Sequence, residues 1–400
     1  MPLSQTREIT PAQRLDNLRY AIRDLVGLAN EIKKQGNKIL YLNVGDPNIF
    51  DFSTPAHVIE AAYRAMRDNK NGYAPSEGLP EALDAIRAEA ARAGITSVQD
   101  VFVTNGAGEA VDVCLTALLN PGENVLTPSP DYPLYTAVLC KTGAELNSYY
   151  LNEEDGWQPE VDDIRKKITS RTRAIILINP NNPTGALCTR KMLEDIAEIA
   201  RQHNLLIIAD EIYDKLILDG AEHLSIAGVA PDVPVVTIGG LSKNYLAPGW
   251  RIGWGIVSGE AAAVKPFTEG IHKLLRARLS ANHPEQYAIK VALEGPQDHL
   301  IEVRKKLSTR RDITVEACNS IPGMSCVPPR GAFYAFPKID VPQDDAAFVK
   351  QLLVERHILV VQGSGFGQKP GTKHFRIVFL PQEPVLKEAY SEIREFMRTR

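Results

Sequence analysis

The chain has 400 residues, 44% of them hydrophobic, which is enough to bury a large core in two domains or in one large domain with a smaller one appended. Its 45 basic and 49 acidic residues give a formal net charge of −4 and form no long run of one sign. This balance argues against nucleic acid and against an anionic membrane as partners, and it favours small-molecule chemistry.

The first expected element is a helix over residues 15–36, LDNLRYAIRDLVGLANEIKKQG, which ends at a glycine stop signal. A strand-like run, ILYLNV, follows it. We expect this N-terminal part to pack with the C-terminal end of the chain. We therefore assign residues 1–48 to an N-terminal arm and a part of the small domain.

From about residue 100 to residue 257, short β-branched runs alternate with longer helical patterns. The runs are VFVT, ENVLTP, ELNSYY, AIILI, LLIIA, VVTI and GWGIV, and we take them as seven strands. This alternation is typical of an α/β fold, in which helices cover both faces of a doubly wound, mainly parallel sheet. We assign residues 49–290 to this large domain.

The pattern changes after Pro284. Helices are expected near residues 298–317, near residues 344–356 and from about residue 383. Between them lie the strand-like runs GAFYAFP, ILVVQG and HFRIVFL. These elements predict a smaller α+β domain over residues 291–400.

Export and membrane insertion are not expected. The N-terminal residues MPLSQTREIT lack an apolar stretch long enough for a signal peptide, and no run of about 18 apolar residues occurs. The cysteines show neither a metal-binding spacing nor a paired framework, so we expect no metal site and a soluble, cytoplasmic protein. The cysteines are Cys114, Cys140, Cys188, Cys318 and Cys326.

Polar residues follow four of the expected strands, at the edge where ligands bind in open α/β sheets. They form the motifs NGAGEA (residues 105–110), NPNNPTG (179–185), DEIY (210–213) and GGLSK (239–243). Each motif alone has a simpler explanation, because NGAGEA could be a glycine turn and Asp210 could cap a helix. Their combination in this order is much more specific.

Lys243 and Arg251 lie in the stretch GGLSKNYLAPGWRIGW, which contains no acidic residue. Two cations in so apolar a segment need a counter-charge. An anionic small molecule could supply it.

Taken together, these motifs resemble those of the class I and II aminotransferases, which are fold type I enzymes that depend on pyridoxal 5′-phosphate (PLP). The resemblance runs from about Leu42 to the C-terminus and is strongest to the prokaryotic alanine aminotransferases. It implies an α/β fold with a large domain built on a seven-stranded, mainly parallel sheet and a smaller α+β domain. It also implies a homodimer with shared active sites.

The resemblance assigns the contacts of the cofactor ring. Lys243 would bind the aldehyde covalently and, once freed by the amino-acid substrate, act as the base that moves the Cα proton. Asp210 would keep the ring nitrogen protonated. Asn182 and Tyr213 would donate hydrogen bonds to the phenolic oxygen, and Tyr132 would stack on the ring.

The phosphate group would lie at the N-terminus of the helix that follows the first of the four motifs. The expected phosphate ligands are Gly106, Ala107, Gly108, Ser242, Arg251 and, from the neighbouring subunit, Tyr73. Tyr73 could instead be a packed core tyrosine. Two residues depart from the habit of the family: the acidic Glu109 ends the phosphate loop, and Gly240 stands where many relatives have a serine.

Arg376, in the run HFRIVFL, matches the arginine with which the family grips the α-carboxylate of the substrate, and Gly45 and Asn182 would line the same pocket. Arg376 could instead form a structural salt bridge. Tyr20 and Arg23 are candidates to bind the distal carboxylate of glutamate or 2-oxoglutarate, although Arg23 could equally lie on a solvated helix face.

The implied reaction converts L-alanine and 2-oxoglutarate to pyruvate and L-glutamate by a ping-pong mechanism. Relatives that act on aspartate, valine or aromatic amino acids share the cofactor residues, so these donors stay open as alternatives. A PLP-dependent C–S lyase would share the fold, the lysine and Arg376. A cofactor-binding regulator would normally carry a fused DNA-binding domain, which the short N-terminal arm disfavours.

Overall fold

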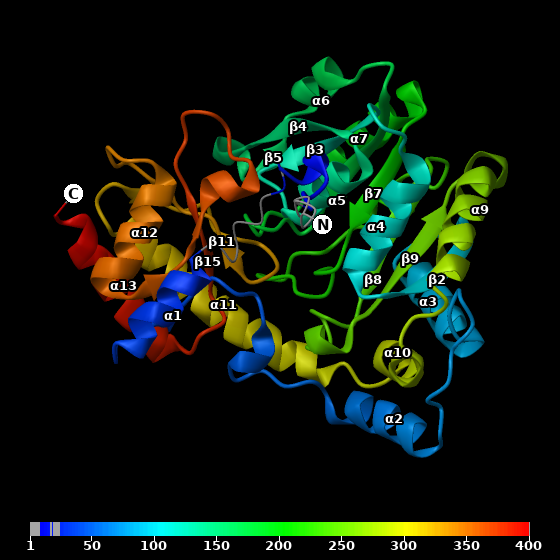
Figure 1. The fold of residues 1–400 in the computed structure, drawn as a ribbon, viewed down its shortest axis with the longest axis horizontal. Coiled ribbons are helices and arrows are strands. Elements are labelled where there is room, and N and C mark those ends of the chain that lie inside the picture. Colours follow the sequence, from blue (N-terminus) through cyan, green and yellow to red (C-terminus); the bar gives the residue numbers. More distant parts are fainter. Residues whose placement is uncertain (1–8, 17, 19–24, 400) are drawn as a thin grey trace, which may run out of the picture.

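The computed structural model describes residues 9–16, 18 and 25–399 (Figure 1). Within these residues, eight strands form one large sheet in the order β2-β9-β8-β7-β6-β3-β4-β5. Neighbours among β3, β4, β6, β7 and β8 pair in parallel, whereas β9 is antiparallel to both of its neighbours and β5 is antiparallel to β4. The strands are β2 (Val98–Asn105), β3 (Asn124–Ser129), β4 (Glu145–Asn152), β5 (Gln158–Pro159), β6 (Thr172–Ile178), β7 (Leu206–Asp210), β8 (Val235–Gly240) and β9 (Ile252–Ser258).

All seven strands expected from the sequence are present in this sheet, and the predicted α/β fold is confirmed. The expected number of strands was one too low. The additional strand, β5, is two residues long and lies at the edge of the sheet. Two residues are too few to show an alternating or a continuous apolar pattern, so periodicity does not reveal this strand.

Helices pack on both faces of the sheet (Figure 1). Strand β6 shows why, because Ile175 and Leu177 join the core on one face while Ala174 and Ile176 join the core on the other. A strand that is buried on both faces reads as a continuous apolar run. The helices of this part are α2 (Ala56–Arg67), α3 (Pro80–Arg92), α4 (Ala107–Leu118), α5 (Leu134–Thr142), α6 (Val161–Lys167), α7 (Arg190–His203), α8 (Ile226–Val229), α9 (Ala261–Ala277) and α10 (His283–Glu294).

Helix α7 illustrates how local sequence sets these boundaries. The side chain of Thr189 accepts a hydrogen bond from the Met192 N–H at 3.2 Å and so caps the first turn. Asn204 ends the helix in the left-handed conformation, with a φ of 51°. Between these residues, an apolar stripe that includes Leu193 and Ile196 is buried against the sheet.

A second group of elements lies to one side of the large sheet, and the long helix α11 (Asp298–Asn319) runs toward it (Figure 1). Its other helices are α1 (Val26–Lys34), α12 (Asp345–Arg356) and α13 (Glu383–Met397). Its strands are β1 (Leu40–Tyr41), β10 (Met324–Ser325), β11 (Tyr334–Ala335), β12 (Lys338–Ile339), β13 (Ile358–Leu359), β14 (Val361–Gln362) and β15 (Phe375–Val378).

Short 3₁₀ helices occur in both parts of the described chain, at Gln13–Leu15, Pro47–Ile49, Glu153–Asp155, Pro248–Trp250 and Gly363–Phe366.

Residues 26–41 lie in this second group, whereas the 3₁₀ helix Gln13–Leu15 lies against α5 beside the large sheet, where Cys140 Sγ donates to the Arg14 carbonyl at 3.3 Å. Strand β1 pairs in parallel with β13, and Ala29 and Ile32 of α1 pack with Leu353 and Leu359. The expected helix over residues 15–36 is described only in part, and α1 covers its C-terminal half. The domain boundaries at residues 48 and 290 stay a prediction.

The structure also bears on membrane insertion. In the described part of the chain, none of the helices combines the length and the apolar character needed to cross a bilayer.

Candidate active site

A cavity of about 360 Å³ lies at the carboxyl edge of the large sheet, where the segments that follow β6, β7 and β8 meet strand β15. Its lining contains most of the residues that the sequence singled out. These residues are Gly45, Ala107, Gly108, Tyr132, Asn182, Asp210, Tyr213, Ser242, Lys243, Arg251 and Arg376. Residues from widely separated motifs therefore share one pocket.

A few of the predicted site residues do not line this cavity. Gly106 lies just beside it, at the N-terminus of α4. Tyr73 is 80% exposed, so it is not the packed core tyrosine that was one alternative for it. Tyr20 and Arg23 lie outside the described residues.

Lys243 lies on the turn that follows β8. Its Nζ donates a hydrogen bond to the Gly45 carbonyl at 2.8 Å. Burial lowers the pKa of its amine from 10.5 to about 8. The positive charges of Arg376 and Arg251 lower this pKa further, while Asp46 and Asp210 oppose the shift. An amine of this kind is partly neutral near pH 8 and can act as a nucleophile or a base.

Two glycines at the end of β8 allow the backbone to pass close to strand β9. A Cβ on Gly239 would lie 2.5 Å from Trp254 Nε1, and a Cβ on Gly240 would lie 2.8 Å from the Ile252 carbonyl oxygen. The second of these distances explains the departure noted in the sequence. A serine at position 240 would collide with backbone atoms of β9 in this structure.

Asp210 ends strand β7 and is buried, and burial raises the pKa of its carboxyl group. Two hydrogen bonds hold its oxygens: Tyr135 Oη donates to Oδ2 at 2.9 Å, and the Ile212 N–H donates to Oδ1 at 3.3 Å. The bond from Tyr135 and the charge of Lys243 act against the effect of burial. Sequence reasoning missed Tyr135, whose one signal is its place three residues after Tyr132 in the motif DYPLY.

Tyr213 forms a hydrogen bond across the pocket. Its hydroxyl lies 2.9 Å from the hydroxyl of Tyr334, and both side chains are buried. Tyr334 comes from strand β11 in the run GAFYAFP and was not among the residues expected at the site. This bond connects the segment after β7 with the second group of elements.

Arg376 lies within strand β15 and is 1% exposed. Its Nη1 donates to Asn182 Oδ1 at 3.1 Å, and its Nη2 donates to the Asn43 carbonyl at 2.6 Å. The guanidinium also lies over the rings of Tyr334 and Phe366, at 4.7 Å and 4.8 Å from their centroids. These contacts fix the orientation of a cation at the wall of the pocket.

An anion-binding end is formed where helix α4 begins. Gly106 has a φ of +80° and caps the helix, so the first N–H groups of α4 lie at the cavity. A Cβ on Gly106 would lie 2.2 Å from Arg251 Nη2, which shows how closely the guanidinium approaches the helix N-terminus. Ser242 lines the cavity as well. A helix N-terminus with an arginine beside it suits a phosphate or carboxylate group.

The acidic residue of this loop does not line the cavity. Glu109 accepts a hydrogen bond from the Asn105 N–H at 2.6 Å, and its carboxylate lies 3.3 Å from Arg278 Nε. Its charge is therefore matched by partners outside the anion-binding end.

The pocket thus offers an amine of lowered pKa, a buried carboxylate, an anion-binding helix N-terminus and a second, fixed arginine. This set suits a ligand that carries a carbonyl group and an anionic group, together with a substrate that carries a carboxylate. The fold and the pocket agree with the sequence motifs on one class of enzyme. The chain belongs to the class I and II aminotransferases, because the sequence model of the family described as "Aminotransferase class I and II" matches residues 37–393.

Comparison with individual proteins narrows this class. The chain is 42% identical to the glutamate-pyruvate aminotransferase AlaA of Escherichia coli K12, over 97% of this chain and 98% of that protein. It is 40% identical to the alanine aminotransferase of Mycobacterium tuberculosis H37Rv, over 98% of this chain and 93% of that protein. The solved alanine aminotransferase of Pyrococcus furiosus superposes with a TM-score of 0.95 at 44% identity, covering 98% of this chain and all of the other.

Proposed function

We propose that this aminotransferase uses PLP to transfer the amino group of L-alanine to 2-oxoglutarate, giving pyruvate and L-glutamate by a ping-pong mechanism. The observation that carries the proposal is that one pocket brings together Lys243, Asp210 and Arg376. Alanine as the donor is supported by the names of the relatives that are 40%, 42% and 44% identical to this chain.

When bound, PLP supplies an aldehyde that joins to amines and a ring that withdraws electrons from the substrate Cα. Lys243 would bind this aldehyde and later carry the Cα proton, a role that its pKa of about 8 supports. Asp210 would accept a hydrogen bond from the protonated ring nitrogen. Burial raises the pKa of Asp210, and the positive charge of the ring nitrogen would lower it again, so that Asp210 would be ionised beside the ring.

Three further side chains would hold the ring in place. Tyr213 would donate a hydrogen bond to the phenolic oxygen. Asn182 accepts from Arg376 through Oδ1, which leaves its NH₂ group to donate to the same oxygen. Tyr132, which lines the pocket, would stack on the ring.

The anion-binding end of the pocket would hold the phosphate group. The helix N-terminus supplies positive charge that is fixed by the fold, and the Arg251 guanidinium, which donates to the Pro248 carbonyl at 2.9 Å, adds a second positive charge. The ligands would be the N–H groups of Gly106, Ala107 and Gly108, the Ser242 hydroxyl and the Arg251 guanidinium.

Arg376 would bind the α-carboxylate of the substrate in a bidentate arrangement. Gly45 leaves room beside it, since a Cβ at that position would lie 2.2 Å from the Tyr334 hydroxyl. With the carboxylate fixed, the Cα proton of the substrate can be directed toward Lys243. Tyr20 and Arg23 remain our candidates for the distal carboxylate of glutamate and 2-oxoglutarate.

A homodimer is part of the proposal. Three apolar side chains spaced along one face of α2 are exposed, namely Ile59 (46%), Tyr63 (51%) and Met66 (42%), and Tyr73 is exposed beyond the end of this helix. An apolar stripe of this kind on a large enzyme suits a subunit interface. Tyr73 would then reach the phosphate group in the neighbouring subunit.

We also propose a cytoplasmic location, which the five unpaired thiols of the described residues support. We further propose the division into an N-terminal arm with part of the small domain (residues 1–48), a large domain (49–290) and a small domain (291–400).

An optical experiment tests the function. The purified protein loaded with PLP should be yellow, lose this colour with L-alanine and regain it with 2-oxoglutarate. A panel of amino acids in single-turnover half-reactions should rank alanine and glutamate above aspartate, valine and aromatic donors. Bleaching that no 2-oxo acid restores would instead indicate a lyase, and failure to bind PLP would reject the proposal.

A further inference from the structure

Lys243 and Tyr213 lie on two turns that follow neighbouring strands. The turn of residues 211–216 follows β7, and the turn of residues 241–247 follows β8. Each turn is closed by backbone hydrogen bonds within itself. Such internal bonds shape each turn but do not fix the position of one turn relative to the other beyond the strand ends.

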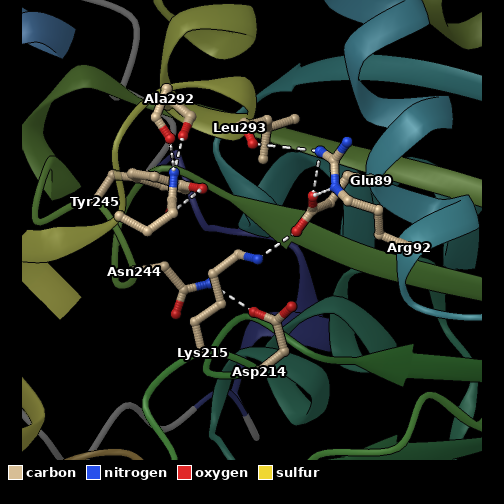
Figure 2. Close-up of polar contacts among 10 residues, drawn as sticks. Glu89, Arg92, Asp214, Lys215, Asn244, Tyr245, Ala292 and Leu293 are labelled. Carbon is tan, nitrogen blue, oxygen red and sulfur yellow. Dashed lines mark hydrogen bonds and ion pairs between the residues drawn. The ribbon is translucent and has the colours of Figure 1, made fainter. Parts of the chain in front are cut away.

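The residues that come next on the two turns contact each other behind the pocket. Asp214 follows Tyr213 and Asn244 follows Lys243, and both line a smaller cavity separate from the active-site pocket. Asn244 Nδ2 donates a hydrogen bond to Asp214 Oδ1 at 2.6 Å (Figure 2). Among the described residues, this is the hydrogen bond that joins the two turns.

The turn that carries the acceptor, Asp214, is anchored to two helices. Lys215, next to Asp214, bonds to Glu89 on α3, and Glu89 also accepts from Arg92 (Figure 2). Arg92 Nη2 in turn donates to the Leu293 carbonyl on α10 at 3.3 Å. The turn of residues 211–216 is therefore tied to helices α3 and α10.

The turn that carries the donor, Asn244, is held by a further contact. Asn244 is buried, and its carbonyl oxygen lies 2.9 Å from His299 Nε2 on α11. A lysine side chain is long and flexible, so the place of its amine depends on how firmly its backbone is held. Groups one step removed from the reacting atoms supply this support in many active sites.

We propose that Asn244 is a positioning residue for Lys243, and that its bond to Asp214 sets the place of the lysine amine relative to Asp210 and Tyr213. This inference rests on the proposed function, because it assumes that Lys243 is the residue that binds PLP. It does not give Asn244 any contact with cofactor or substrate.

The test reverses the hydrogen bond. In Asn244→Asp, two carboxylates would face each other across the distance of the present bond, and the turns should separate. The double variant Asn244→Asp/Asp214→Asn restores a bond in the opposite direction without changing the net charge. Tyr245→Phe is the matched control, because Tyr245 is buried on the same turn but bonds to Gln297 at 3.2 Å and not to Asp214.

The measurement is the rate at which the apoprotein takes up PLP between pH 6 and pH 10, followed by absorbance. Borohydride capture and peptide mapping would then identify the labelled lysine. The charged groups that act on the Lys243 amine are Asp46, Asp210, Arg251 and Arg376, and all of them are kept in every variant.

Asn244→Asp should slow uptake about tenfold or more, the factor expected for a lost hydrogen bond to a charged group. The midpoint of the pH profile should also rise in Asn244→Ala, which adds no charge near the amine, because a displaced turn admits water to an amine that burial holds at low pKa. The double variant and Tyr245→Phe should stay within about threefold of the wild type. Asn244→Ala removes the same hydrogen bond without adding a charge, so its PLP uptake should be slowed as well. This variant replaces Asn244→Asp in the test when Asn244→Asp does not fold.

Wild-type rates in both single Asn244 variants would overturn the inference, as would a double variant as slow as Asn244→Asp. Labelling of another lysine in the wild type would instead reject the proposed function. The two failures are therefore distinguishable.

Discussion

Two of the cationic side chains that line the pocket, Lys243 and Arg376, are held in opposite ways. On the lysine side, which comprises Asp210, Tyr213 and Lys243, the Lys243 amine bonds to one backbone carbonyl and has a pKa lowered to about 8. On the arginine side, Arg376 is fixed by two hydrogen bonds and by the rings of Tyr334 and Phe366. The first arrangement suits a group that must change charge and move, and the second suits a group that must bind without moving.

Removing the lysine should have the largest effect. Lys243→Ala should reduce turnover by roughly a thousandfold or more, because no other amine would take over covalent binding and proton transfer. The measurement is single-turnover absorbance with L-alanine.

Thermal unfolding of the apoprotein supplies the control for this variant. Folding lowers the pKa of Lys243 from 10.5 to about 8, so the protonated lysine destabilises the folded state at pH 7, and this cost disappears as the pH rises through that interval. Lys243→Ala should therefore unfold no earlier than the wild type at pH 7. A much lower melting temperature would attribute the lost activity to misfolding.

The arginine side should depend on geometry more than on charge. Arg376→Lys keeps a positive charge but loses the planar fork, so kcat/KM should fall by about a hundredfold, the scale of a lost bidentate contact. PLP uptake should be nearly unchanged. Arg311→Lys is a control, since Arg311 is also buried but bonds to Asp219 and the Pro329 carbonyl, away from the pocket. Equal losses in the two variants would contradict the assigned role.

The large sheet and the motifs that follow its strands could be predicted from the sequence. Strands buried on both faces, such as β6 and β7, are continuous apolar runs and are therefore recognisable in the sequence. Because ligands bind at the carboxyl edge of such a sheet, the motifs that follow these strands could be placed together, and Asp210, Tyr213 and Lys243 do share one pocket.

The residues that support the pocket could not be found in this way. Tyr135 contacts Asp210 from helix α5, and Tyr334 contacts Tyr213 from a strand two residues long. Neither contact leaves a pattern in the sequence, because each depends on how elements far apart in the chain pack together. Asn244 and Asp214 are adjacent to predicted residues, yet the bond between them depends on the positions of two separate turns.

A milder change on the lysine side should affect cofactor binding. Tyr135→Phe removes the hydrogen bond that lowers the pKa of Asp210, so this pKa should rise and the carboxylate should pair less well with the ring nitrogen. The Kd for PLP, measured by fluorescence titration of the apoprotein, should increase about five- to tenfold. Tyr149→Phe is the control, because Tyr149 is equally buried but donates to the Ile176 carbonyl at 2.8 Å. A Kd that changes equally in both variants would show that the effect is not specific to Asp210.

The smallest expected effect is that of the Arg376 charge on the pKa of Lys243. Burial is the main cause of the lowered pKa of Lys243, and the charge of Arg376 lowers it further. Arg376→Gln should therefore raise this pKa above about 8 and move the pH profile of PLP uptake to higher pH. Uptake near pH 7 should then be a few-fold slower, because less of the amine is neutral.

Arg376→Lys separates charge from geometry in this measurement. It keeps the positive charge near Lys243, so its uptake profile should stay close to that of the wild type while its kcat/KM falls. Profiles that move equally in Arg376→Gln and Arg376→Lys would mean that the lysine responds to packing around position 376 and not to the charge there. Packing at position 376 would then influence the pKa of Lys243. The two cations would still differ in how they are held for binding, but the proton transfer by Lys243 would depend on both sides of the pocket.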